Sequence, residues 1–182
     1  QDAQDAITEY FLAPPGTGFF EPFLEQIRSK TLLADKAQTK TRHQWNLKAI
    51  AAFVKHDILH QAGVTYSKLP KNVSSYLSLG NTSVSLRPEL LVRQGTKYGF
   101  IKFLFKNPEK NLLNDRSRES VASLLHLYGT ENPVENATLD RKLCKVVDVF
   151  QGSITEAPKS YVARLKDVEA ACQEISAQWA SL

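Results

Sequence analysis

Two apolar segments, residues 84–93 and 98–106, flank the four residues Gln94-Gly-Thr-Lys97. Glycine at the first central position suits a type II′ turn, which joins two antiparallel strands. With Gly95 and Thr96 at the centre of the turn, pairing starts at Gln94 and Lys97 and continues outward until Glu89 faces Lys102. The chain is therefore predicted to fold around a β-hairpin that carries an acid and an amine on the same face.

Alternation along the hairpin predicts one polar face and one buried face. The more polar face carries Arg87, Glu89, Leu91 and Arg93, opposite Phe100, Lys102 and Leu104. The other carries Val84, Leu86, Leu90 and Val92, opposite Ile101, Phe103 and Phe105. We expect the second face to be core and the first to remain open beside Pro88.

Periodicity predicts the remaining elements of a single domain spanning residues 1–182. Helices are expected at 2–12, 44–62, 115–128 (closed by Gly129) and 160–181, with the apolar cluster 19–27 forming a docked helix. Further strands are expected at 73–79 and 143–150, with a short piece at 153–157. This order predicts an α/β fold, a mixed central sheet flanked by helices.

The hairpin residues also fit a known pattern. Pro88-Glu89, the turn and Gly99-Phe100-Ile101-Lys102 resemble the Pro-Asp … Glu-x-Lys signature of PD-(D/E)XK nucleases. The predicted helix, three strands, helix and strand of residues 44–150 resemble the αβββαβ, restriction-endonuclease-like core of that superfamily. Residues 1–43 then form a helical, basic extension, and residues 151–182 a hairpin piece with a long helix.

The resemblance implies a magnesium-dependent site. Glu89 would be a metal ligand and Lys102 the catalytic lysine, because Mg²⁺ takes oxygen ligands and an amine can serve the attacking water. The sequence has Phe100 where the second acid should stand, so Asp148 or Asp57 would have to replace it. A cross-strand ion pair without catalysis and a remnant nuclease site stay open as alternatives.

Charge indicates possible partners. The net charge is +4 and the sequence pI about 9.0, and segment 28–48 holds six basic residues and one acid. Arg87, Arg93, Lys40 and Arg42 are predicted to contact phosphates of DNA or RNA. The alternatives are a solvated basic face and a non-enzymatic interaction domain. In the latter, an apolar stripe on helix 160–181 would bind a partner or a second copy, although packing within the chain also explains the stripe.

Other function classes lack their motifs. The four histidines and two cysteines show no zinc-site spacing, and no phosphate-binding loop or nucleophile elbow occurs. Cys144 and Cys172 lie in apolar segments, which indicates buried thiols. No early segment reads as a secretory signal and no apolar run reaches membrane-spanning length, so a cytoplasmic location without a membrane contact is expected.

Overall fold

The computed structural model describes residues 2–13, 18–56, 61–70, 75–106 and 114–179. The chain divides into two compact units, each described by itself below. The first consists of Gln1–Ala62, Phe103–Leu112 and Asp148–Ser153, and the second of Gly63–Lys102, Leu113–Val147 and Ile154–Leu182. Among the described residues, no helix combines the length and the apolar character needed to cross a membrane.

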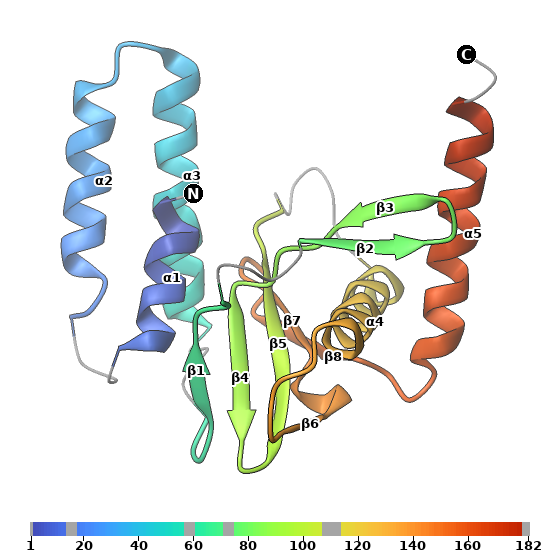
Figure 1. Cartoon of the computed structure of the whole chain (residues 1–182). Coiled ribbons are helices and arrows are strands. Elements are labelled where there is room, and N and C mark those ends of the chain that lie inside the picture. Colours follow the sequence, from blue (N-terminus) through green and yellow to red (C-terminus); the bar gives the residue numbers. More distant parts are fainter. Residues whose placement is uncertain (1, 14–17, 57–60, 71–74, 107–113, 180–182) are drawn as a thin grey trace. The chain divides into compact units, whose positions relative to one another are not determined.

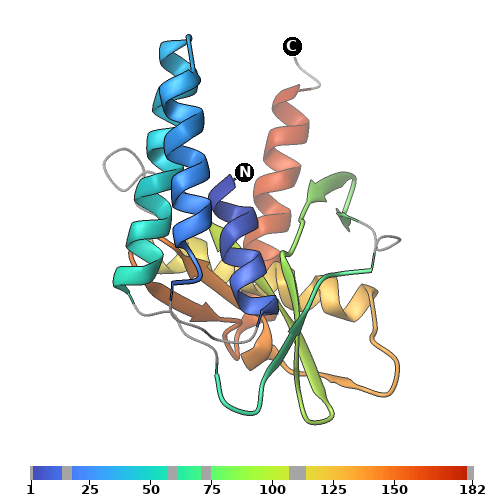
Figure 2. The same cartoon turned by 90° about the vertical axis from the view of Figure 1, so that its left-hand side faces the viewer.

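The first unit contains three helices: α1 (Asp2–Leu12), α2 (Glu21–Leu33) and α3 (Ala37–Lys55). Figure 2 shows α2 and α3 running side by side, with α1 against them. Asp2 links the three helices, because it accepts hydrogen bonds from Lys30 (3.0 Å) and from the Asn46 amide (3.1 Å). The boundaries of α3 differ from the helix predicted at 44–62. The helix begins earlier, at Ala37, and ends at Lys55. Residues 57–60 of the predicted helix lie outside the described part.

Aromatic rings fill the core of this unit. Tyr10 and Phe11 on α1 pack edge-to-face against Phe53 on α3, with ring centroids 5.6 and 5.9 Å apart. Phe20 stacks on Tyr10, and Phe103, at the end of a strand, stacks on Phe11. Such pairs contribute about 0.5–1.5 kcal/mol each beyond the apolar area that they bury. The helix predicted from the cluster 19–27 is confirmed as α2.

The second unit is built on a six-stranded mixed sheet (Figure 1). Its strands are β1 (Thr65–Ser67), β4 (Leu90–Gln94), β5 (Lys97–Leu104), β7 (Lys145–Asp148) and β8 (Ser153–Glu156) in that order, with β6 (Thr138–Leu139) paired parallel to β5. The pairs β1–β4 and β4–β5 are antiparallel. Gly99 lies against Leu143, and Val149 N–H donates to Leu104 O (3.1 Å), so β7 runs parallel to β5. The predicted α/β class with a mixed sheet is confirmed.

Two strand predictions are wrong in their boundaries. Segment 84–93 was expected to be one strand, but Pro88 has no N–H to donate to a ladder and the strand is interrupted there. The part before it, β3 (Thr82–Ser85), pairs with β2 (Tyr76–Leu79) in a separate hairpin, and only β4 joins the sheet. The first strand of the sheet is instead the three-residue β1. Residues 71–74 of the predicted strand 73–79 lie outside the described part.

Helix α4 (Asp115–Glu131) separates β5 from β7 along the chain. Asn114 caps its first turn, because its side chain accepts from Ser117 N–H (2.8 Å). Gly129 was expected to end the helix, but it lies within it: a Cβ there would come within 2.5 Å of Leu139 and 3.1 Å of Phe100. The glycine thus serves close packing against the sheet rather than termination.

Helix α5 (Tyr161–Trp179) packs on α4 and on the β2–β3 hairpin. Its Cys172 is buried, and Ser176 hydrogen-bonds to Thr82 of β3 (2.8 Å). The rest of the predicted apolar stripe is less well packed: Leu165 and Val168 are half-buried and Val162 is exposed. Near the end of the helix, Ile175 is 58% and Trp179 76% exposed. Both cysteines are free and buried, as expected.

Candidate functional site

The β4–β5 hairpin has the predicted register. Gln94 pairs with Lys97 and Leu90 with Ile101, and Glu89 N–H donates to Ile101 O (2.9 Å). Gly95 has φ of +57°, which fits the predicted turn. One step beyond Leu90 and Ile101, Glu89 and Lys102 face each other.

Glu89 and Lys102 form a largely buried ion pair. The Lys102 ammonium contacts the Glu89 carboxylate and also donates to the backbone carbonyl of Arg87 (2.7 Å). The Glu89 side chain is only 4% exposed and that of Lys102 22%. The carboxylate is thus withdrawn from water, with a cation held against it.

The face that carries this pair is more closed than the sequence predicted. Leu91 and Phe100 on the same face are buried, Phe100 to 3% exposure. The Phe100 ring packs edge-to-face on Tyr128 of α4 (centroids 5.0 Å apart) and on Tyr98 (5.9 Å). The expectation of an open polar face is therefore wrong around Phe100, which α4 covers, whereas Arg87 and Arg93 on the same face are exposed. Position 100, where the nuclease signature has its second acid, therefore holds the packed ring of Phe100.

Replacement metal ligands were predicted at Asp148 and Asp57. Asp148 is buried, and its Oδ1 accepts from the backbone N–H groups of Phe150 and Gln151 (both 3.1 Å), which shapes the turn after β7. Asp148 belongs to the first unit and Glu89 to the second. Asp57 lies outside the described residues. Within the part of the chain that the structure describes, no cluster of three or more acidic, histidine or cysteine side chains could hold a metal ion.

The predicted phosphate-contacting residues are all exposed. Arg87 precedes β4, and Arg93 lies on it, beside a pocket of about 330 Å³ that also borders Leu69 and Pro70. Lys40 and Arg42 lie on α3 in the first unit. Helix α3 contains four Lys or Arg residues, all exposed, and no Asp or Glu. A helix with this composition presents only positive side-chain charge.

No family model matches this chain, and neither curated proteins nor solved structures provide a match. Function is therefore inferred from the geometry of the chain itself.

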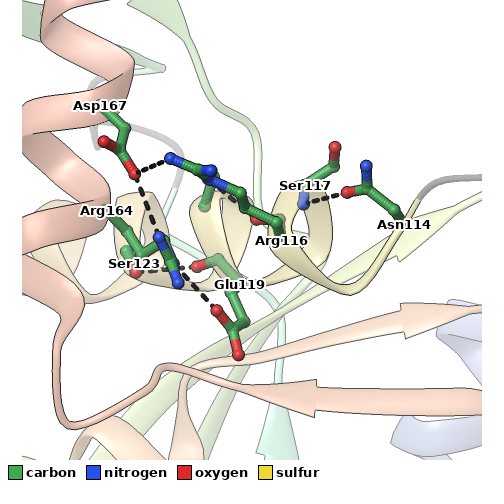
Figure 3. Close-up of polar contacts among 8 residues, drawn as sticks. Asn114, Arg116, Ser117, Glu119, Ser123, Arg164 and Asp167 are labelled. Carbon is green, nitrogen blue, oxygen red and sulfur yellow. Dashed lines mark hydrogen bonds and ion pairs between the residues drawn. The ribbon is translucent and has the colours of Figure 1, made fainter.

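Sequence reasoning missed a polar network between α4 and α5 (Figure 3). Arg164 donates to Glu119 (2.9 Å) and to Asp167 (3.1 Å), and Arg116 donates to the same Asp167 oxygen (3.0 Å). Hydrogen bonds from Arg116 and Arg164 lower the pKa of the Asp167 carboxyl. The network joins two helices that are 30 or more residues apart in the chain, so spacing along the sequence gives no signal for it. It ties α5 to α4 rather than forming a reactive group.

Trp45 lies near the end of the basic segment 28–48 and makes two contacts that the sequence analysis did not predict. The ring packs edge-to-face on Phe150 (5.7 Å, 82°), and the Lys48 ammonium lies 4.8 Å from its centroid. Both contacts lie within the first unit. The sequence signal was the placement of Arg42 and Lys48 three positions on either side of a tryptophan.

Proposed function

We propose that this chain is a PD-(D/E)XK nuclease-like domain that binds nucleic acid, in which Glu89 and Lys102 serve as a structural ion pair. The observation that carries the proposal is the direct contact of these two side chains from adjacent antiparallel strands. The chain order supports it, because α3, the strands β1, β4 and β5, the helix α4 and the strand β7 follow one another as in the αβββαβ core. The β2–β3 hairpin is inserted between β1 and β4, and β6 between α4 and β7.

The surroundings of Glu89 favour binding without cleavage. Mg²⁺ binds through several oxygen ligands and is held in phosphoryl-transfer sites by one or two carboxylates plus substrate phosphates. Here one carboxylate is neutralised by Lys102, and Phe100 stands where a second acid would be needed. Removing a buried carboxylate from its ammonium to receive a cation would leave the ammonium without its counter-charge.

Positive surface charge supports a nucleic-acid partner. The four cations of α3 have no acidic neighbour on the same helix, and Arg87 and Arg93 add exposed cations in the second unit. Each Lys or Arg that neutralises a phosphate releases condensed counterions, so affinity falls as salt rises. Binding through phosphate contacts is therefore recognised by a steep decrease of affinity with salt concentration.

The test uses the full chain, a fluorescently labelled DNA oligonucleotide and anisotropy between about 50 and 200 mM salt. If four phosphates are engaged, log K is expected to fall against log[salt] with a slope of about −3. The Lys40→Ala/Arg42→Ala double variant should reduce the slope by about 1.5. An affinity that does not change with salt, or no binding at the lowest salt, contradicts the proposal.

Cleavage is assayed separately in Mg²⁺ and Mn²⁺. We expect intact DNA and RNA, because Glu89 and Lys102 are assigned a structural role. Metal-dependent cleavage that disappears in Lys102→Met, with stability unchanged, would show that the pair is catalytic and that this assignment is wrong.

A second candidate function is supported by the exposed apolar residues near the end of α5. Ile175 and Trp179 would suit a protein partner or a second copy of the chain. If a dimer forms through this helix, sedimentation velocity should show it, and Ile175→Lys should abolish it. Ala177→Lys is the matched control, because it is exposed and about 200° around the helix from Ile175. A monomer at all concentrations removes the dimer candidate.

A further inference from the structure

Two hollows in the first unit meet at the same pair of side chains. The smaller, of about 380 Å³, borders Arg42, Trp45, Asn46, Phe105 and Phe150. The larger and more open, of about 610 Å³, borders Gln38, Thr39 and Thr41 together with Arg42 and Trp45. Arg42 and Trp45 thus line both hollows. The smaller volume lies within the range of pockets that bind small organic ligands.

The smaller hollow has an aromatic wall that is held in place. Trp45 packs on Phe150, and the backbone of Phe150 is fixed at both ends: its carbonyl accepts from His56 Nε2 (3.0 Å), and its N–H donates to Asp148 Oδ1 (3.1 Å). Phe105 adds a second ring to the lining. Such preorganised rings offer flat apolar surface without the entropy cost of ordering them on binding.

The polar groups around the hollows are cationic or neutral. Neither lining, as far as the structure describes it, contains an acidic side chain. Arg42 provides a guanidinium to both hollows and Lys48 an ammonium near the Trp45 ring, whereas the Asn46 amide is already bonded to Asp2 and to Ala3 N–H. Thr39 and Thr41 line the larger hollow, where the Thr41 hydroxyl donates to Ala37 O (3.0 Å). This set of groups accommodates a flat ring attached to a negatively charged backbone.

We propose that the two hollows lined by Trp45 bind consecutive unpaired nucleotides of a single-stranded nucleic acid. One base enters the smaller hollow against the Trp45 ring, the phosphate beside it meets Arg42, and the strand continues along Thr39 and Thr41. This inference rests on the proposed function and narrows it to single strands. In a duplex the base faces are stacked on one another, whereas unpaired bases stack on aromatic side chains.

The chain provides its own probe, because Trp45 and Trp179 are its two tryptophans. In Trp179→Phe, all indole fluorescence comes from Trp45. We expect an oligothymidylate of about 15 nucleotides to quench this fluorescence to saturation, with a midpoint that matches anisotropy under the same conditions. A duplex of the same length is expected to leave the fluorescence largely unchanged.

Variants then separate ring stacking from charge. Trp45→Ala should weaken single-strand binding roughly 5- to 150-fold, the range of one lost base–aromatic stack, and change duplex binding by less than about 2-fold. Trp45→Phe keeps a ring and should restore most of the affinity. Arg42→Ala should weaken binding more than Arg28→Ala, which removes the same charge from α2 away from both hollows.

Two different results would separate the single-strand site from nucleic-acid binding in general. Equal affinity for single strands and duplexes, without quenching and without an effect of Trp45→Ala, overturns the single-strand site and leaves nucleic-acid binding intact. No binding of either nucleic acid at low salt removes the proposed function, and the single-strand site with it.

Discussion

Replacing Lys102 by methionine tests whether the ion pair is structural. Methionine keeps much of the aliphatic stem and removes the ammonium, so the Glu89 carboxylate stays 4% exposed without this cation. Breaking a buried pair by removing one partner costs about 3–5 kcal/mol. Because Lys102 is 22% exposed and water can reach the site from its side, we place the loss at the lower end, about 3 kcal/mol.

Replacing Glu89 should lower the free energy of unfolding less than replacing Lys102. Glu89→Gln leaves the ammonium partly in water and still bonded to the Arg87 carbonyl, so we expect a loss of about 1–2 kcal/mol. Replacing both partners by apolar side chains removes the uncompensated charge, and the Glu89→Leu/Lys102→Met double variant should be more stable than Lys102→Met alone.

The assay is urea unfolding at neutral pH, followed by circular dichroism and extrapolated linearly. Lys97→Met is the matched control, because Lys97 lies on the same strand and pairs with Asp140 (2.8 Å) while 58% exposed. An exposed pair of this kind contributes at most about 1 kcal/mol. If Lys102→Met and Lys97→Met lower the free energy of unfolding equally, the argument from burial is wrong.

Three further outcomes follow from the packing of the second unit. Burial raises the pKa of the Cys144 thiol to about 12, so the thiol ionises first in the unfolded chain. This thiol should lower the free energy of unfolding by about 1.4 kcal/mol per pH unit between about pH 9 and about pH 12. Urea titrations of Cys144→Ala should show a smaller loss, because Tyr98 and Tyr128, whose pKa values burial also raises, remain. Gly99→Ala would bring a Cβ to 2.4 Å from the backbone of Leu143, so the free energy of unfolding should fall by about 3 kcal/mol or more. An unchanged free energy of unfolding would mean that β5 can move away from Leu143 without cost. Phe100→Glu should lower the free energy of unfolding by about 3–5 kcal/mol, because it removes the packing on Tyr128. If Mg²⁺ raises the melting temperature of this variant, the assignment of Glu89 and Lys102 to a purely structural ion pair is contradicted.

The hairpin and its ion pair could be predicted because both depend on local information. A two-residue turn with glycine at its first position fixes the register, and the register fixes which side chains face each other. Glu89 and Lys102 follow from Gly95 by counting. The α/β class followed in the same way from elements whose periodicity is strong over many residues.

What the sequence did not reveal depends on contacts between distant segments. The strand β1 has three residues and mostly exposed side chains, so it has neither length nor alternation to mark it. Gly129 has the typical appearance of a helix end, and only the closeness of Leu139 explains why the helix continues through it. The smaller hollow beside Trp45 also depends on Phe105 and Phe150, which lie 60 or more residues further along the chain.

The substitution at position 100 and the burial of the pair are parts of one arrangement. Two carboxylates on this face would repel each other and would need a cation and water, which opposes covering the face with a helix. With phenylalanine at position 100, the face has one ring for Tyr128 to pack against and one carboxylate for one ammonium to neutralise. The face then carries no net charge at the pair, and α4 can cover it. If the domain binds nucleic acid, the contacts must therefore come from side chains that remain in solvent, such as the cations of α3 together with Arg87 and Arg93.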